Sequence, residues 1–157
     1  MKSVTAMTII RDSLRDNLTD PFETAGGAYR GGSMWIFEDE PSSGTKYPRI
    51  QLLKIDNPTE VISMGYNYTE KEDLYVNIWV YTKNGFKITV SGTEYKNSKL
   101  AEYYLGLIKE TLKADAANLH TDGTLGYKHI NTTIVDYDPE TQLYFGAVTI
   151  RVFYFNQ

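Results

Sequence analysis

The chain of 157 residues contains no cysteine, and this absence excludes a whole group of functions. Disulfide bonds, thiolate catalysis and zinc sites built on cysteine all require the missing side chain. Basic residues are also in deficit, with 16 Lys and Arg against 20 Asp and Glu, and no long basic run interrupts that balance. We therefore expect no covalently cross-linked fold and no large face that binds the phosphates of a nucleic acid.

Long apolar runs are missing as well. The first 18 residues are interrupted by Arg11, Asp12, Arg15 and Asp16, which is unlike the apolar region of a signal peptide. No uncharged apolar stretch elsewhere is long enough to cross a bilayer. The sequence predicts a protein that is made in, and stays in, a reducing aqueous compartment without membrane contact.

Signatures of catalysis and metal binding are absent too. The sequence has no phosphate-binding glycine loop, no nucleophile elbow and no dinucleotide fingerprint. The two histidines, His120 and His129, do not have the spacing of metal ligands one helical turn apart. Asp136, Asp138 and Glu140 superficially resemble a calcium loop, but the required glycine and glutamate further along are missing. We expect no catalytic residue, no metal site and no cofactor, and hence no enzyme.

Aromatic residues, in contrast, are abundant, with 13 Tyr, 6 Phe and 2 Trp. Tyrosine combines an apolar ring with a hydroxyl group that favours water, so it suits surfaces that become buried on association. Tyrosine is also favoured in strands, which would explain the same excess in a strand-rich fold. The composition leaves both interpretations open.

Two amphipathic helices are predicted. Residues 1–20 form the first, because apolar side chains recur at spacings of three and four, at Val4, Met7, Ile10, Leu14 and Leu18. Residues 97–117 form the second, with a wide apolar stripe suited to lying across a sheet. Its members are Leu100, Ala101, Tyr104, Leu105, Leu107, Ile108, Thr111 and Leu112.

Strands are predicted between residues 47 and 90 and again between 128 and 155. The alternation is clearest from Leu74 to Tyr81, and Asn84-Gly85 predicts a hairpin whose second strand ends at Val90. The last strand places Val148, Ile150, Val152 and Tyr154 on one face. We expect a single α+β domain spanning 1–157, with two helices packed on a mostly antiparallel sheet of about five to six strands.

Residues 22–46 are rich in glycine and show no periodicity, which predicts a long, flexible N-terminal loop or arm. Trp35 and Phe37 lie within it, and such large apolar side chains usually dock on a surface. That surface is either the sheet of this domain or a neighbouring subunit. Phe153 and Phe155 occupy the second face of the last strand. Our candidate interface residues are therefore Trp35, Phe37, Phe153 and Phe155.

The order of these elements resembles the tail-terminator and tail-completion (head–tail joining) proteins of long-tailed bacteriophages. It consists of a helix, a loop, a strand beginning Tyr47-Pro48-Arg49-Ile50, a long hairpin from Leu74 to Val90, a helix from Ser98 to Ala117 and a closing hairpin. The resemblance covers most of the chain. It rests on element order, size and pattern, because the family has no catalytic motif.

The resemblance implies a homo-oligomeric ring, a hexamer, at the head-proximal end of the tail tube. Such a ring ends tube polymerisation and joins the tail to the head connector, so its partners are copies of itself, the tail tube protein and the head-closure protein. The genome passes through the channel without specific binding. The implied location is the neck of the virion, after assembly in the host cytoplasm. Alternatives are another neck component, such as an adaptor or head-closure protein, and a small-molecule-binding α+β domain.

Overall fold

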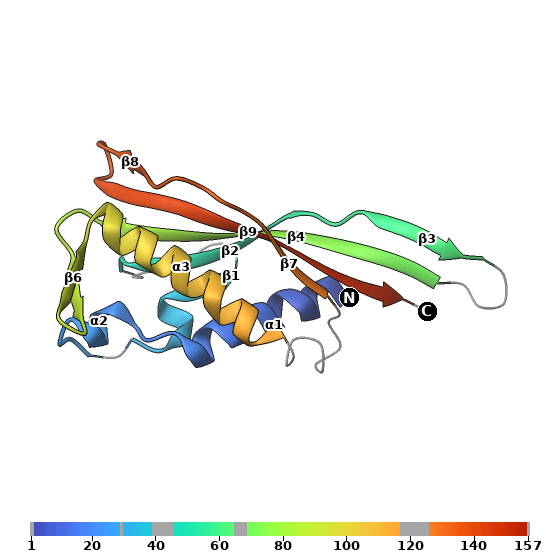
Figure 1. Cartoon of the computed structure of the whole chain (residues 1–157), viewed down its shortest axis with the longest axis horizontal. Coiled ribbons are helices and arrows are strands. Elements are labelled where there is room, and N and C mark those ends of the chain that lie inside the picture. Colours follow the sequence, from blue (N-terminus) through green and yellow to red (C-terminus); the bar gives the residue numbers. More distant parts are fainter. Residues whose placement is uncertain (1, 29, 39–45, 65–68, 117–125, 157) are drawn as a thin grey trace.

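The computed structural model describes residues 2–28, 30–38, 46–64, 69–116 and 126–156. A mostly antiparallel sheet of seven strands runs along the molecule, and two long helices pack on one of its faces (Figure 1). The predicted α+β class is confirmed. The strand count is higher than expected, because three very short or peripheral strands attach to the long ones and a separate two-stranded sheet is also present.

The bounds of the elements are as follows. The helices are α1 (Lys2–Asn17), α2 (Pro21–Thr24) and α3 (Ser98–Ala114), with the 3₁₀ turn η1 (Gly32–Met34). The strands are β1 (Ile36–Glu38), β2 (Arg49–Asp56), β3 (Thr59–Ser63), β4 (Thr69–Lys83), β5 (Lys87–Val90), β6 (Thr93–Lys96), β7 (Gly126–Thr132), β8 (Asp136–Asp138) and β9 (Leu143–Asn156). None of the helices that the structure describes combines the length and apolar content needed to span a bilayer.

The large sheet is built around β4 and β9. These strands pair from Glu70 opposite Asn156 to Lys83 opposite Leu143. The strand order is β1-β2-β4-β9-β7, with β3 beside one end of β4 and β8 beside one end of β9. Among the strands that the structure describes, only β1 runs parallel to its neighbour, β2.

The core lies between this sheet and the helices α1 and α3. The alternate residues of β4 that were predicted to share a face, from Leu74 to Val80, are all buried, as are those of β9 from Val148 to Tyr154. The predicted stripes of both helices face them, with Ile10 and Leu14 of α1 and Ile108 of α3 fully buried. The periodicity therefore identified the buried faces correctly.

The predicted hairpin from Leu74 to Val90 is wrong in its second strand. Asn84-Gly85 does form a turn, but β5 pairs with β6 in a separate small sheet and not with β4. Both edges of β4 are already occupied, by β2 and β9. The β5–β6 turn has positive φ at Ser91 (49°) and Gly92 (80°), as the tightest hairpins require.

The segment 22–46, predicted to be a flexible arm, contains α2, η1 and β1 in its described part. Residues 29 and 39–45 of that segment lie outside the described residues. The cause of the order is Asp20, which is fully buried just before α2. Its carboxylate accepts hydrogen bonds from the backbone N–H groups of Phe22 and Arg30, each at 3.0 Å. The side chain of Asp20 therefore both caps the N-terminus of α2 and holds the backbone at Arg30.

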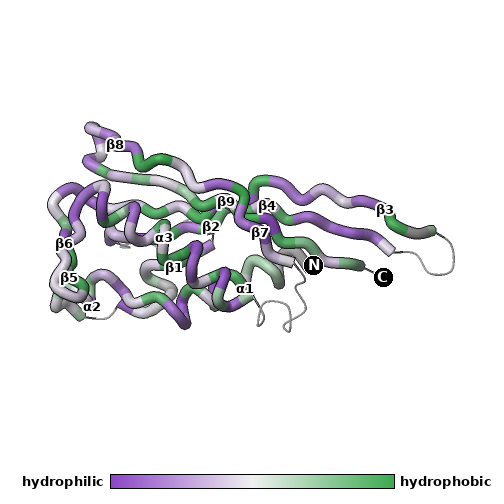
Figure 2. The backbone as a smooth tube through the Cα atoms, viewed as in Figure 1, coloured by the Kyte–Doolittle hydropathy of each residue, from purple (hydrophilic) through white to green (hydrophobic). Residues whose placement is uncertain are grey.

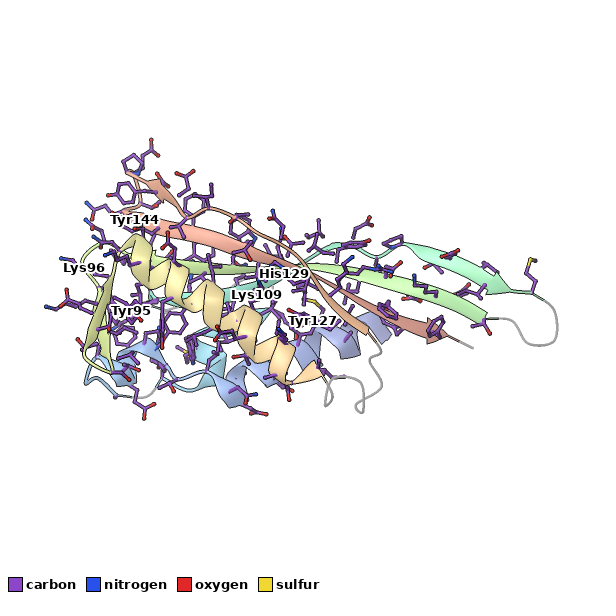
Figure 3. The ribbon with its side chains drawn as sticks, in the orientation of Figure 1. Tyr95, Lys96, Lys109, Tyr127, His129 and Tyr144 are labelled. Carbon is purple, nitrogen blue, oxygen red and sulfur yellow. The ribbon has the colours of Figure 1, made fainter. Side chains whose placement is uncertain are left out.

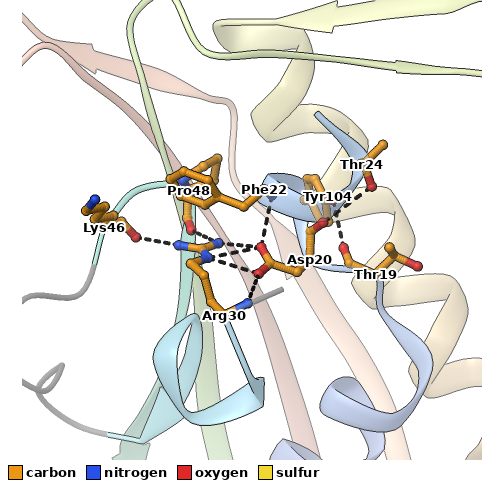
Figure 4. A network of polar contacts seen from close by, with 8 residues as sticks. All are labelled: Thr19, Asp20, Phe22, Thr24, Arg30, Lys46, Pro48 and Tyr104. Carbon is orange, nitrogen blue, oxygen red and sulfur yellow. Dashed lines mark hydrogen bonds and ion pairs between the residues drawn. The ribbon is translucent and has the colours of Figure 1, made fainter. Parts of the chain in front are cut away.

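Arg30 completes this network (Figure 4). Its guanidinium pairs with Asp20 at 2.7 Å and donates to the backbone carbonyls of Lys46 (2.7 Å) and Pro48 (2.8 Å). The guanidinium also lies 4.2 Å from the ring centre of Phe22. These contacts connect the end of the α1 region to the start of β2.

Candidate interaction surfaces

The face of the sheet opposite α1 and α3 is covered by no helix of the described chain (Figure 1). We call it the bare face. The alternation that buries one set of strand residues places the other set here. Two members of this second set, Phe37 and Ala147, are buried. The half-buried members include Arg49, Gln51 and Leu53 of β2, Tyr75, Asn77, Trp79 and Tyr81 of β4, and Phe145, Thr149, Arg151 and Phe153 of β9.

Three rings of the bare face form a continuous aromatic cluster. The ring centre of Trp79 lies 6.2 Å from that of Tyr81 and 6.2 Å from that of Phe145, and Tyr81 and Phe145 are 6.4 Å apart. Tryptophan and tyrosine are the residues most enriched where protein interfaces concentrate their binding energy. The cluster has the composition of a docking surface.

Arg49 lies beside this cluster in a box of rings. Its guanidinium carbon is 4.2 Å from the ring centre of Tyr47, 5.8 Å from that of Tyr81 and 5.9 Å from that of Phe37. Its Nε is buried and has no hydrogen-bond partner among the described residues. Burial raises the pKa of Tyr81, and the positive charge of Arg49 partly opposes that effect. Arg49 thus offers a hydrogen-bond donor with no acceptor in the described chain.

The middle of the bare face is satisfied internally. Arg151 pairs with Asp73, with Nε and a terminal nitrogen each 2.7 Å from the carboxylate. The hydroxyl of Thr149 donates to the side chain of Asn77 at 2.6 Å. Arg151 and Arg49 therefore differ although they lie on the same face of one sheet, because Arg151 pairs with a carboxylate and the Nε of Arg49 has no acceptor among the described residues.

The second surface is a projecting extension of the sheet, which we call the tongue. It comprises residues 59–64, 69–71 and 155–156, and it extends past the N-terminus of α1 (Figures 1 and 2). Its large apolar side chains are exposed: Val61 (47%), Ile62 (52%), Met64 (82%) and Phe155 (44%). Apolar residues gathered on a projection differ from the scattered ones found on any surface and mark an interaction site.

The tongue also carries an excess of negative charge. Glu60 is exposed on β3, Glu70 and Lys71 follow on β4, and the adjoining Glu72 and Asp73 add two carboxylates. Lys71 lies 3.6 Å from Asp73, so its charge is partly offset. A partner for this element therefore needs both apolar and cationic groups.

The four residues selected from the sequence have different fates. Trp35 is 2% exposed and packs edge-on against Tyr104 at 6.1 Å in the core. Phe37 is 6% exposed and lies beneath Arg49. Both side chains are buried within one copy of the chain, Trp35 on the helix side of the sheet and Phe37 beside Arg49. This outcome was one of the two left open by the sequence.

Phe153 and Phe155 remain on the surface. The ring of Phe153 crosses Gly126 so closely that a Cβ there would be 1.8 Å from it. Phe153 thereby covers a glycine at the edge of the sheet, which is a known way to stabilise such a position. Phe155 is the more exposed of the two and belongs to the tongue.

Two hollows border α3. One of about 440 Å³ lies between the end of α1, the β5–β6 hairpin and α3, and is lined by Leu18, Ile88 and Tyr103 among others. Its natural polar anchor would be Tyr104, but that hydroxyl donates to the backbone carbonyl of Thr19 at 3.0 Å. The other, of about 390 Å³, lies between α3 and residues 132–135. Neither brings together the convergent polar groups that fix a small ligand.

His129 and Lys109 face each other beside the second hollow (Figure 3). His129 Nε2 lies 2.7 Å from the hydroxyl of Thr132, and burial together with the charge of Lys109 lowers the pKa of His129. His120 lies outside the described residues. In the part of the chain that the structure describes, no three potential metal ligands cluster.

The sequence Asp136 to Glu140 forms a turn. The carboxylate of Asp138 accepts hydrogen bonds from the backbone N–H of Glu140 (3.0 Å) and the hydroxyl of Thr141 (2.8 Å). Its oxygens are thus used to close the turn between β8 and β9, as the hairpin interpretation of the sequence predicts.

Comparison of the chain with models of known protein families gives no match, and a search among curated proteins gives none either. A functional assignment therefore depends on the bare face and the tongue. Sequence reasoning missed Arg49 and the aromatic cluster as a site. The alternation that identified Leu74 to Val80 as buried also placed Tyr75, Trp79 and Tyr81 together on the opposite face, and that was the available signal.

Proposed function

We propose that this chain is a structural protein of a long-tailed bacteriophage that forms a homo-oligomeric ring, a hexamer, at the head-proximal end of the tail tube. The ring ends polymerisation of the tube and joins the tail to the head connector. The observation that carries the proposal is the presence, on one chain, of an aromatic face without a helix over it and a projecting apolar tongue. The proposed family is the one that the chain resembles in element order, apart from the expected hairpin from Leu74 to Val90, whose second strand pairs with β6 instead.

Two different surfaces on one chain favour head-to-tail association. In an open head-to-tail assembly, one surface stays uncovered at the first subunit and the other surface stays uncovered at the last. Closure into a ring covers both surfaces of every subunit. The interface residue types also agree with this role, because Trp, Tyr and Arg dominate the energetics of protein contacts. The proposed role requires no catalytic residue.

The charge of the chain fits a channel through which a genome passes. A formal net charge of −4 disfavours tight, non-specific binding of DNA phosphates. The proposed partners are other copies of this chain, the tail tube protein and the head-closure protein. The proposed location is the neck of the virion, reached after assembly in the host cytoplasm.

Electron microscopy of tail tubes with and without the purified protein tests this function. We expect rings of about six subunits at one end of each tube and an arrest of tube growth. The replacement Ile134→Ser is a suitable control, because Ile134 is 92% exposed and lines the hollow beside α3, on the helix side of the sheet. If tubes continue to grow in the presence of the protein and carry no rings at their ends, the proposal is contradicted. Binding to head connectors without binding to tubes would instead identify another neck component, such as an adaptor or head-closure protein.

A further inference from the structure

No carboxylate of the described residues forms an ion pair with Arg49. Arg151, on the same face, has a carboxylate at 2.7 Å, whereas Arg49 is surrounded by the rings of Tyr47, Tyr81 and Phe37. Its buried Nε has no acceptor among the described residues. A guanidinium N–H that is buried and unpaired destabilises the chain, and a carboxylate that pairs with the terminal nitrogens of the same guanidinium would offset this cost. The surrounding rings exclude water and strengthen such a pair.

Glu60 is a carboxylate presented on the tongue. It is exposed, and it is followed along β3 by the exposed side chains of Val61 and Ile62. Within the described chain, β3 pairs only with β4, so side chains from both of its faces can reach a partner that approaches its free edge. Glu60 therefore combines the charge that Arg49 lacks with adjacent apolar groups that match an aromatic surface.

Within one copy, these two residues cannot meet. Glu60 lies opposite Lys71 of β4, and Arg49 lies opposite Tyr81 of the same strand. Ten residues of extended strand separate those positions, which is about 33 Å. Only a second copy can bring Glu60 to Arg49.

We infer that the tongue of one copy docks on the aromatic end of the bare face of the next copy, and that the carboxylate of Glu60 pairs there with the guanidinium of Arg49. Val61 and Ile62 then lie against the cluster of Trp79, Tyr81 and Phe145. The contact joins unlike surfaces, so every copy uses its tongue on one neighbour and its bare face on the other. The inference rests on the proposed ring-forming function and specifies which surfaces make the ring.

Charge reversal tests the contact directly. In sedimentation experiments on the full chain, Arg49→Glu and Glu60→Arg should each weaken self-association by about tenfold or more, because each places like charges together. The double variant R49E/E60R should recover much of the association. An equimolar mixture of the two single variants should also recover it, because every contact between unlike variants again joins opposite charges.

Two further variants separate folding from binding. Arg49→Met keeps an apolar stem and removes the charge, so it should weaken association while the thermal unfolding midpoint changes little. Glu102→Arg makes the same change of charge as Glu60→Arg at an exposed position of α3, on the opposite side of the sheet from the bare face, and should leave association unchanged.

The outcomes distinguish this inference from the proposed function. Unchanged sedimentation of both single variants, or failure of the double variant and of the mixture to recover, overturns the Glu60–Arg49 contact. A wild-type chain that stays monomeric at all concentrations overturns it as well. In either case, rings on tail tubes would leave the proposed function standing, whereas uncapped tubes would remove the function itself.

Discussion

The two faces of strand β4 use the same backbone for different purposes. Leu74, Val76, Ile78 and Val80 point under α1 and α3 and are at most 1% exposed. Tyr75 and Trp79, alternating with them, point away from the helices and stay half-buried. Aliphatic side chains lose contact with water completely, while aromatic side chains with a polar atom tolerate partial exposure until a partner arrives. One strand thus contributes one face to the buried core and the other face to a partly exposed surface.

The largest difference between the faces should come from Trp35, which lies in the core on the helix side. Trp35→Ala should lower the free energy of unfolding by about 3–5 kcal/mol, because it leaves a cavity among fixed neighbours. Trp79→Ala on the bare face is the matched control and should cost less, since its ring is already partly hydrated. Urea unfolding measures both. Equal losses would show that the bare face is as tightly packed as the core.

The next largest effect concerns the buried ion pair that orders the segment after α1. Asp20→Ala should lower the free energy of unfolding by about 3 kcal/mol, because it leaves the Arg30 guanidinium without its counter-charge. Asp12→Ala removes one of the two carboxylates that pair with Arg11, at a half-exposed site, and should cost less than about 1 kcal/mol. Chemical denaturation of the two variants compares them. A small effect at Asp20 would show that the backbone carbonyls alone hold Arg30.

A smaller effect on stability is expected at Arg49, although it is half-buried. Arg49→Met should change the free energy of unfolding by less than about 1 kcal/mol, since the lost attraction to the rings is offset by removal of an unpaired donor. Thermal unfolding at a concentration below that of self-association measures this. A loss comparable with that at Trp35 would place Arg49 in the core and not at a surface prepared for a partner.

The smallest effect is a pH dependence at His129. The folded state lowers the pKa of this side chain below its usual 6.5, because burial and the charge of Lys109 disfavour the imidazolium. Below pH 6.5 the unfolded chain therefore binds more protons than the folded one, so this contribution to stability is present above pH 6.5 and is lost as the pH falls through the lowered value. Unfolding midpoints measured between pH 7.5 and about 5 should fall less in His129→Gln than in the wild type. An identical pH profile for the two proteins would contradict the assignment.

The local sequence pattern was sufficient to predict the buried residues of helices and strands with a regular apolar periodicity. The stripe of α3 and the alternation of β4 and β9 identified the buried residues correctly, because a helix or strand that must cover a core repeats its apolar side chains at a fixed interval. Local pattern failed for β5, whose alternation was assigned to a hairpin with β4. Alternation reports that one side of a strand is buried, but it carries no information about which strand lies beside it.

The candidate site divides in the same way. Phe155 is exposed, in agreement with its predicted place on the second face of β9. Trp35 and Phe37 were assigned to a loop because glycines surround them, and the sequence did not show which residues they would pack against. A glycine-rich stretch has many accessible conformations, and the buried Asp20–Arg30 pair selects one of them. The two residues of this pair are not separated by an interval typical of a helix or a strand, so the sequence periodicity does not predict their contact.

The amino-acid sequence by itself determined the α+β class, the absence of cysteine chemistry and the two faces of each long strand, because these depend on composition and on intervals of two or about four residues. Tertiary structure alone decided that β4 would be enclosed by β2 and β9, that residues around Trp35 would be ordered, and that the tongue would extend beyond the helices. It also decided that Arg49 would lie among rings without an acceptor for its Nε in the described chain. These outcomes depend on contacts between residues far apart in the chain, where burial and competition for partners are settled only when the whole domain has formed.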